Sequence, residues 1–367
     1  MPHDGVPGAT RRAFLHGAVA LAVASKVSRA AADVPSAVPE VDALSIQVLV
    51  DNATFGPFLP DITAPGLRVE RNTGRPAPRM SRHALMAEFG LSLLARSQRG
   101  AQSRSVLVDF GYSPEVLANN LAMLGIDTGE LDAAVLSHGH LDHYGGFAAV
   151  FGGKVPARHL PLIVGGEETF CERVAQIGSP PPVMGTLDRK ELAQAGLDVQ
   201  IRPAPAVLGE HAFTTGLIPL ETFERAAIPT QMRPGVGCDK AALAPAKQNQ
   251  AQLADDGEHE LATFYNVKGL GLVVIASCSH RGVLNSVRRA QAISGVRKVH
   301  AVVGGFHLVR PRTDDEARRT VEEFVKMDPA YIVPMHCTGE VFIAEALRVM
   351  PDKIIRTYVG NRLMFAA

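Results

Sequence analysis

The sequence contains no tryptophan, and its charges of opposite sign cancel. Lysine plus arginine and aspartate plus glutamate number 37 each among 367 residues, so the formal net charge at pH 7 is +0. Proteins that bind nucleic acids present a basic surface to the phosphates, or aromatic side chains on which bases stack. The sequence indicates neither kind of surface, so we expect no nucleic-acid partner.

Cysteine and long apolar runs are also scarce. Four cysteines are too few and too widely spaced to predict a disulfide framework: Cys171, Cys238, Cys278 and Cys337. After residue 32, no stretch is apolar over the roughly 18 residues that a membrane span needs. With 46% hydrophobic and 20% charged residues, the composition excludes disorder, collagen and coiled coil, and predicts an ordinary globular core.

The first 32 residues have the features of a twin-arginine signal peptide. Arg11 and Arg12 precede an apolar run at residues 17–24, and the alanines at 30–32 suit cleavage. An unstructured tail or a single membrane helix is the alternative interpretation. We interpret residues 33–43 as a linker, and we expect a periplasmic or secreted protein that is not inserted in a membrane once the signal is removed.

The densest group of chemically active side chains lies at residues 138–143. Three histidines and an aspartate directly follow residues 131–136, which are predicted to form a buried strand: His138, His140, Asp142 and His143. Imidazole nitrogens and carboxylate oxygens are ligands that zinc favours. Residues two apart can point the same way from an extended turn, which makes His138 and His140 one pair of ligands. Four ligands exceed the needs of one ion, so the motif predicts two divalent ions about 3.5–4 Å apart.

Further histidines follow three predicted strands in the second half of the chain. The strands and the residues after them are 271–276 with Cys278 and His280, 299–303 with His307, and 331–334 with His336. The carboxyl ends of strands in an open α/β sheet lie on the side where ligands bind. We therefore expect these side chains to converge with the first cluster.

Other elements are predicted from local signals. Ser113, Pro114 and Gly125 are typical of the ends of a helix. A capping box predicts a second helix over residues 313–327, and residues 91–95 and 106–109 are predicted to form paired strands. Further predicted elements are a strand at 44–50, helices at 147–151, 189–195 and 283–293, a strand at 199–202, and a hairpin formed by 261–267 and 270–275.

The sequence does not assign a single role to an arginine-rich segment and three isolated histidines. Residues 55–82 contain five arginines and are predicted to form a solvated loop, or alternatively a positively charged lid over an anionic substrate: Arg68, Arg71, Arg75, Arg79 and Arg82. Three isolated histidines are more typical of surface or core positions than of ligands: His159, His211 and His259.

The pattern His-x-His-x-Asp-His after a strand resembles the second motif of the metallo-β-lactamase superfamily. From residue 44 to the C-terminus, further segments resemble in order the branch that includes the dihydropterin ribofuranosyl-aminobenzene phosphate synthases: 49–52, 88–92, 107–111, 277–282, 304–308 and 336–339. The resemblance implies one α/β domain over residues 44–367, folded as a four-layer αββα sandwich. It also implies that Asn52 lies near the metals, although the side chain could instead cap the following turn.

The resemblance implies which side chains hold each ion. His138, His140 and His280 would hold the first ion, and Asp142, His143 and His336 the second. Where family members commonly have a bridging aspartate, this chain has Cys278. Its thiolate could bridge the ions, His280 could take that place, the second ion could bind weakly, or Cys278 could simply pack as a small apolar side chain.

We therefore predict a metal-dependent hydrolase with two divalent ions. Zinc is expected, with iron or manganese as alternatives, because a thiolate disfavours magnesium. A hydroxide bound to the ions would attack an ester, lactone or phosphate ester of a small molecule, and Asp142 would orient it. His307 is interpreted as a proton donor, a ligand or a contact for the substrate, and Cys337 as a packing residue.

Two other functions stay open at this point. One is a synthase of the methanopterin type, although Phe89 and Phe110 stand where that branch commonly has histidine and threonine. The other is a metal-binding or redox protein without hydrolytic activity. The sequence does not predict an oligomeric state.

Overall fold

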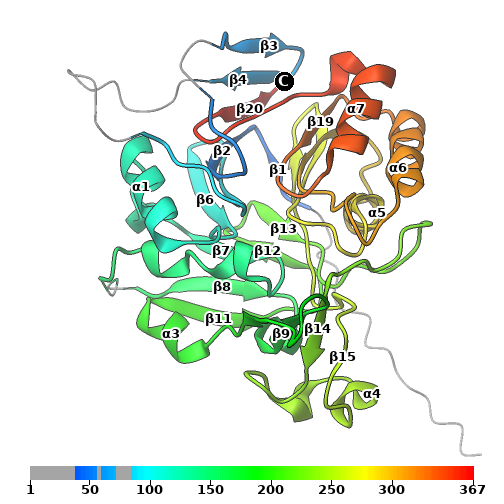
Figure 1. Cartoon of the computed structure of the whole chain (residues 1–367). Coiled ribbons are helices and arrows are strands. Elements are labelled where there is room, and N and C mark those ends of the chain that lie inside the picture. Colours follow the sequence, from blue (N-terminus) through cyan, green and yellow to red (C-terminus); the bar gives the residue numbers. More distant parts are fainter. Residues whose placement is uncertain (1–37, 56–58, 72–83, 155, 157) are drawn as a thin grey trace, which may run out of the picture. The chain divides into compact units, whose positions relative to one another are not determined.

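Two mixed β-sheets form the centre of the computed structural model, which describes residues 38–55, 59–71, 84–154, 156 and 158–367 (Figure 1). The predicted signal peptide lies outside the described residues, as do Arg75, Arg79 and Arg82 of the predicted arginine-rich loop. Arg68 and Arg71 are described and lie on or beside a strand that pairs in the larger sheet. No described helix is long and apolar enough to span a membrane.

The larger sheet carries the strand that leads into the first histidine cluster. Among the described residues it has nine strands, in the order β11 (Leu197–Ile201), β8 (Leu160–Val164), β7 (Ala133–Leu136), β6 (Gln102–Val108), β5 (Ser92–Arg99), β2 (Ala43–Val50), β20 (Arg362–Ala366), β4 (Leu67–Glu70) and β3 (Ile62–Ala64). The first four run parallel to one another, and every pair from β6–β5 onward is antiparallel. The predicted strand before the histidines and the predicted β5–β6 pair are confirmed.

The second sheet contains the other predicted ligand strands. Its order, within the described residues, is β12 (Ala206–Leu208), β13 (Ala212–Thr214), β16 (Thr263–Val267), β17 (Gly271–Ala276), β18 (Val299–Gly304) and β19 (Tyr331–Pro334). Strands β16 and β17 form the predicted antiparallel hairpin, and β17, β18 and β19 run parallel. This arrangement brings three strand ends to one edge of the sheet.

The C-terminal part of the predicted linker belongs to the fold. Strand β1 (Glu40–Val41) pairs parallel with β16, and β2 begins at Ala43, so residues 40–43 are not a linker, whereas residues 33–37 lie outside the described residues. Val41 is fully buried between the sheets, and its burial explains why this short segment joins the domain.

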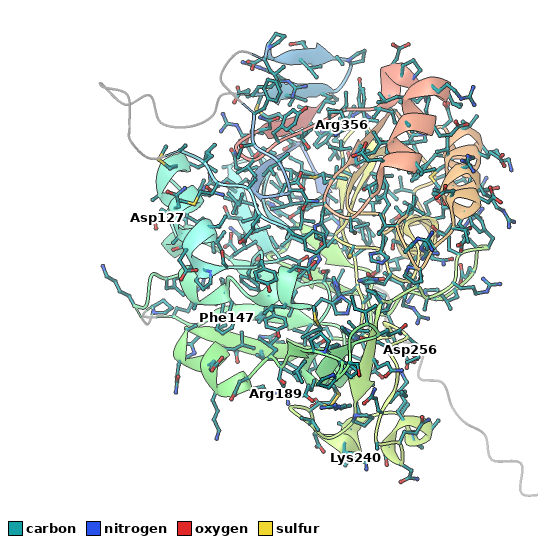
Figure 2. The ribbon with its side chains drawn as sticks, in the orientation of Figure 1. Asp127, Phe147, Arg189, Lys240, Asp256 and Arg356 are labelled. Carbon is teal, nitrogen blue, oxygen red and sulfur yellow. A yellow bond between two sulfur atoms is a disulfide. The ribbon has the colours of Figure 1, made fainter. Side chains whose placement is uncertain are left out.

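Three apolar clusters separate four layers, and side chains fill the spaces between the ribbons (Figure 2). The first lies between the two sheets and includes Ile46 and Leu93 from one sheet with Val273 and Val303 from the other. The second covers the larger sheet beneath α1 (Pro114–Leu124) and α3 (Arg189–Gln194). The third lies under α5 (Val283–Ser294), α6 (Asp314–Met327) and α7 (Glu340–Val349). The αββα fold expected from the sequence is confirmed.

The helices begin and end near the predicted residues, but the Ser113 side chain bonds a different partner from the one expected. Thr313 and Glu316 form the predicted capping box of α6. Helix α1 ends at Gly125 in the left-handed conformation. The Ser113 side chain does not cap α1; instead its Oγ donates to Glu88 Oε2 at 2.5 Å. Short helical segments complete the fold: α2 (Leu141–Tyr144), α4 (Pro245–Gln248), and the 3-10 turns η1 (Thr128–Glu130), η2 (Phe147–Ala149), η3 (Glu167–Phe170), η4 (Lys240–Ala242) and η5 (Pro351–Lys353).

A disulfide that the sequence did not predict joins two segments beside a small third sheet. Its strands, among the described residues, are β10 (Val183–Gly185), β9 (Glu172–Ala175), β14 (Thr230–Arg233) and β15 (Leu253–Ala254). Cys171 and Cys238 are bonded across a sequence separation of 67, with their Cα atoms 4.6 Å apart. Scattered cysteines argue against a framework of bridges, but spacing alone cannot exclude a single long-range one.

Candidate metal centre

All eight predicted site side chains lie at the carboxyl ends of four parallel strands. The residues after β7 are His138, His140, Asp142 and His143; those after β17 are Cys278 and His280; β18 is followed by His307 and β19 by His336. Because β7 belongs to one sheet and the other strands to the second, the centre lies where the two sheets meet. The topology therefore joins ligands that are up to about two hundred residues apart in the chain.

The donor atoms form two triads, each with its members within 4.8 Å of one another. The first triad is His138, His140 and His280, and the second is Asp142, His143 and His336. In the second, His336 Nε2 lies 3.3 Å from Asp142 Oδ2 and 3.2 Å from His143 Nε2. Two ligands of a tetrahedral zinc ion are about 3.3 Å apart, given bonds of about 2.0–2.1 Å. Two of the distances in the second triad match this value, and both clusters are consistent with a metal site.

Glycines let the backbone pass close to its neighbours around the first cluster. A Cβ atom on Gly139 would lie 2.2 Å from the Thr169 carbonyl oxygen, and one on Gly145 would lie 2.0 Å from that of Tyr112. Neither glycine has a positive φ angle. Space, and not backbone freedom, is therefore the reason that glycine occurs between and after these histidines.

The buried carboxylate of Asp109 orients two of the histidines. Its Oδ2 accepts from His143 Nδ1 at 2.7 Å and from Ser137 Oγ at 2.8 Å. The Ser137 oxygen lies 3.0 Å from His138 Nδ1, so it accepts the proton of that ring while donating its own. Both imidazoles consequently carry hydrogen on Nδ1, which leaves Nε2 as a lone-pair donor.

His280 and His140 are held by different partners. His280 Nδ1 donates to the Ala227 carbonyl at 3.0 Å, and the backbone of the His280 loop is fixed by the Glu260 carboxylate, which accepts from His280 N at 2.8 Å. His140 Nε2 lies 3.1 Å from Thr230 Oγ1 and 3.7 Å from Asp255 Oδ2, which leaves Nδ1 for a ligand. The predicted ligands are thus presented with fixed ring orientations.

Two of these nitrogens are buried without any hydrogen-bond partner, namely His138 Nε2 and His280 Nε2. Buried polar atoms are nearly always satisfied, so such orphans require an explanation. A divalent cation within the first triad would satisfy both. The donor set and these orphaned atoms therefore fit a metal ion.

A further layer of charged residues escaped the sequence analysis. Arg173 is almost completely buried, and its Nε donates to Asp255 Oδ2 at 3.0 Å. His259 Nε2 accepts from Gly139 N at 3.0 Å, so this histidine supports the ligand loop and is not part of either triad. Of the other isolated histidines, His159 is exposed and His211 bonds Ser97. No short sequence motif connects Arg173 or Asp255 to the ligands that they support.

Strained backbone is concentrated at the centre. Among the described non-glycine residues with positive φ, four lie here: Asp109, Ser279, His307 and His336. Such conformations cost on the order of 1 kcal/mol each and persist where the surroundings enforce them. Asn52 helps to hold His336 in this conformation, since Asn52 Nδ2 donates to the His336 carbonyl at 2.8 Å.

The pKa shifts differ between the triads. Burial lowers the pKa of His138 and His280, and neighbouring imidazoles lower it further, so both rings are neutral at pH 7. Burial opposes ionisation of Asp142, but the imidazoles of His143 and His336 outweigh it and hold the pKa of this carboxyl below its usual range. Burial also opposes the charge on His336, yet Cys337 and Asp142 raise its pKa to about 9. The second triad therefore attracts positive charge, while the first presents neutral donors.

Two thiols complete the centre. Cys278 Sγ groups with His138 and His143, one ligand from each triad, which places it between the two sites. It also lies 3.0 Å from Cys337 Sγ and 3.6 Å from His307 Nδ1. Cys337, interpreted from the sequence as a packing residue, is therefore part of the same cluster. Another group of carboxylates, Glu168, Asp256 and Glu258, forms ion pairs with the ammonium group of Lys247.

Known proteins resemble this chain in its fold and in the sequence around the first histidine cluster. A family model described as the metallo-beta-lactamase superfamily matches residues 89–165, which include β5 to β8 and the first histidine cluster. In this segment the chain resembles the metallo-β-lactamase superfamily. The crystal structure of a metal-dependent hydrolase of the β-lactamase superfamily has a TM-score of 0.63 at 24% identity. It covers 87% of this chain and 98% of that one, a likeness that shows the fold.

Two archaeal relatives from Methanocaldococcus jannaschii match about 70% of this chain. A 7,8-dihydropterin-6-methyl-4-(β-D-ribofuranosyl)-aminobenzene-5'-phosphate synthase is 27% identical over 282 residues, or 74% of this chain and 90% of the relative. An uncharacterised protein is 29% identical over 261 residues, or 69% of this chain and 85% of the relative.

Two cavities adjoin the two triads and share Phe89, His307 and Cys337. One of about 170 Å³ reaches the triads and is lined mainly by apolar side chains, including Tyr112 and Met184. The other, of about 430 Å³, contains Asn52, His336, Glu340, Arg356 and Tyr358. Phe89 is exposed, and its ring centroid lies 4.9 Å from that of His336, whereas Phe110 is buried in the core.

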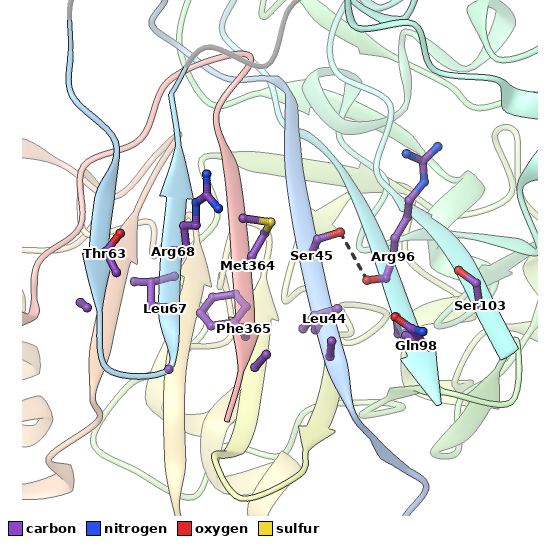
Figure 3. A pocket seen from close by; sticks show the side chains of 15 residues that line it. Leu44, Ser45, Thr63, Leu67, Arg68, Arg96, Gln98, Ser103, Met364 and Phe365 are labelled. Carbon is purple, nitrogen blue, oxygen red and sulfur yellow. Dashed lines mark hydrogen bonds between the residues drawn. The ribbon is translucent and has the colours of Figure 1, made fainter. Parts of the chain in front are cut away.

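A larger cavity, of about 540 Å³, lies elsewhere. Its lining comes from β2, β3, β4, β5, β6 and β20 and their turns, and includes Arg68 and Arg96 (Figure 3). It contains no member of either triad. Size therefore does not identify the site in this fold, whereas converging ligand atoms do.

Replacing Asp109 tests the orientation of the histidines. In an Asp109→Asn variant the amide would donate to His143 and displace the proton from Nδ1 to Nε2, which blocks the ligand atom. We expect zinc affinity to fall about 10–100-fold. Titration of the metal-free protein against a chromogenic chelator measures it.

The matched control is Asp127→Asn, at a carboxylate that caps the distant turn η1 by accepting from Gly129 N. Circular dichroism verifies that both variants fold. Equal zinc affinity in the two variants would show that Asp109 does not orient the ligands.

Proposed function

We propose that this protein is a metal-dependent hydrolase of small-molecule esters, lactones or phosphate esters. The observation that carries the proposal is the pair of triads beside a cavity, together with two donor nitrogens of the first triad that have no protein partner. The first triad would hold one divalent ion and the second another. Cys278, whose Sγ lies within 4.8 Å of a donor atom in each triad, would be a further ligand.

The donor set favours zinc, with iron as the alternative, because imidazole and thiolate ligands suit these metals better than magnesium or calcium. When bound, two such ions would supply an activated water at neutral pH and polarise the bond to be cleaved. Side chains of the protein would orient the substrate, exclude water and transfer a proton.

Asp142 and His307 would carry the protons. Asp142 Oδ2 faces His143 and His336, so its other oxygen is available to accept a proton from the attacking water. His307 lines both cavities, and its Nε2 is buried without a partner. That nitrogen is suited to donate a proton to a departing alcohol.

The cavities suggest a substrate with one apolar and one polar part. Phe89, Tyr112 and Leu141 would contact the apolar part, since they line the smaller cavity. Arg356 and Glu340 line the larger one and would contact the polar part, which an anionic group would also suit. The cation in the smaller cavity, Arg173, is already bonded to Asp255.

A synthase is the second candidate, and the 27% identical archaeal relative supports it. Phe89 stands at the cavity mouth where the synthase branch commonly has histidine, and this difference favours hydrolysis over transfer. Hydrolysis of simple esters, lactones or phosphodiesters by the purified protein distinguishes the two, because a synthase needs two complex substrates.

Metal removal tests the proposed hydrolase. Extraction with a chelator should abolish hydrolysis across the ester, lactone and phosphodiester panel, and added zinc should restore it. Elemental analysis should count two ions per chain. Undiminished turnover by the metal-free protein would refute a metal-dependent mechanism.

A histidine pair provides the matched variants for that experiment. His140→Ala removes a member of the first triad and should lower activity by about 100-fold with a lower zinc count. His300→Ala removes a buried histidine that bonds the Gly66 carbonyl, outside both triads, and should leave the zinc count unchanged.

His307→Gln tests the proton donor. We expect kcat to fall about 100-fold or more for esters of alkyl alcohols, because their leaving groups need a proton. Nitrophenyl esters should lose much less, since nitrophenolate departs without one. Steady-state kinetics with both substrate types gives the comparison, and loss of bound zinc in this variant would make His307 a ligand instead.

We propose that the chain is exported by the twin-arginine route. The disulfide between Cys171 and Cys238 supports this location, because such bonds persist in oxidising compartments. Expressed in a bacterium with this pathway, the full chain should reach the periplasm and be cleaved near Ala32. An Arg11→Lys, Arg12→Lys variant should stay in the cytoplasm at full length. Fractionation with N-terminal sequencing decides, and identical behaviour of the two chains would contradict export by this route.

A further inference from the structure

Two unbonded thiols meet at the centre of the site. Cys278 follows β17 and Cys337 follows β19, the two neighbours of β18, and their Sγ atoms are 3.0 Å apart. A disulfide has its sulfurs about 2.05 Å apart, so closure requires a relative movement of about 1 Å. Rotation of the side chains can provide a movement of that size.

The packing around the thiols keeps them together. Both are at least nine-tenths buried. A Cβ atom on Gly305 would lie 2.8 Å from Cys337 Sγ, so the backbone of that glycine closes one side of the thiol. His307 Nδ1 lies 3.6 Å from Cys278 Sγ on another side. Neither sulfur can easily retreat from the other in a core packed this closely.

Small molecules nevertheless have access to the pair. Both thiols line the cavity of about 170 Å³ that also contains His140 and His280. Such a cavity admits a molecule the size of hydrogen peroxide but not a bulky peptide disulfide such as oxidised glutathione. Peroxides are therefore the class of oxidant that the site would meet.

Oxidation of this pair would remove a donor from the proposed metal centre. Cys278 is grouped with His138 and His143, one member of each triad, and the thiolate is the form of cysteine that binds metals. A sulfur that is bonded to Cys337 is no longer a thiolate. The same atom therefore cannot serve both bonds.

We propose that Cys278 and Cys337 form a reversible disulfide, and that this bond and a fully occupied metal centre exclude each other. One thiol attacks the peroxide, whose O–O bond breaks to give a sulfenic acid and one water. The second thiol displaces the sulfenic oxygen as a second water, and the S–S bond forms. A dithiol reductant returns the two electrons and two protons. The exclusion of metal rests on the proposed function, whereas the disulfide itself does not.

Thiol counting tests the disulfide. Full-length chain, freed of metal, is treated with hydrogen peroxide, denatured and alkylated, and its mass is measured. Two alkylated cysteines are expected before treatment and none after it, with a peptide map that joins residues 278 and 337. Two thiols that remain free after treatment would overturn the proposal.

Zinc titration tests the exclusion. The cross-linked chain should bind zinc at least about 10-fold more weakly than the reduced chain, and dithiothreitol should restore the original affinity. Unchanged affinity in the cross-linked chain would overturn the exclusion. If the reduced chain binds two zinc ions but never cross-links, the disulfide proposal fails and the proposed function does not. A chain that cross-links but binds no zinc when reduced refutes the hydrolase proposal and the exclusion together.

Cys337→Ala is the matched variant, with Cys337→Ser as a second one should the first fold poorly. Without a partner, Cys278 should be oxidised beyond the sulfenic acid to products that dithiothreitol does not reverse. After peroxide and then dithiothreitol, the zinc affinity of the wild-type chain should recover, whereas that of the variant should not. Equal recovery in both would show that Cys337 has no part in protecting Cys278.

Discussion

Lone pairs of buried imidazoles face one another at the centre of this structure, and the surrounding residues hold them there. The two triads gather five imidazoles and one carboxylate, with the donor atoms of each triad within 4.8 Å of one another, and the Cys278 thiol groups with one histidine of each. Without a cation, the unpartnered nitrogens of His138 and His280 lose the hydrogen bonds that water would provide, and such a loss costs about 1–3 kcal/mol for each group. The arrangement is costly as an empty cluster and favourable as a cation site.

The surrounding residues make the arrangement rigid. Asp109 fixes two rings directly or through Ser137, while Glu260 holds the loop that carries His280. Arg173, bonded to Asp255 and to backbone carbonyls, braces the segment beside the Cys171–Cys238 bridge. Each support comes from a different part of the chain, so the centre forms only when both sheets have packed together. Binding of metal would accordingly stabilise the whole domain, because the unfolded chain has no such site.

Much of this could be predicted from local sequence. Periodicity and turn residues predict β7, the β16–β17 hairpin and α6, because these signals act over a few residues. The cluster at residues 138–143 predicts a metal site for the same reason. Family resemblance extends the ligand set to His280 and His336, and the structure brings each into the triad expected for it.

The parts that sequence did not reveal depend on distance in the chain. Arg173 and Asp255 are separated by 82 residues, and Cys278 and Cys337 by 59, so no short pattern predicts that they meet. The bond between Cys171 and Cys238 was missed for the same reason. Burial of Val41 draws β1 into the domain and shortens the predicted linker, a tertiary effect that two residues of sequence cannot signal.

Anomalous X-ray scattering from crystals of the zinc-loaded protein, measured at the zinc absorption edge, tests whether both triads bind metal. We expect two peaks per chain, one about 2 Å from the donor atoms of His138, His140 and His280 and the other about 2 Å from those of Asp142, His143 and His336. Crystals grown in excess zinc that show no peak at either triad would contradict this expectation.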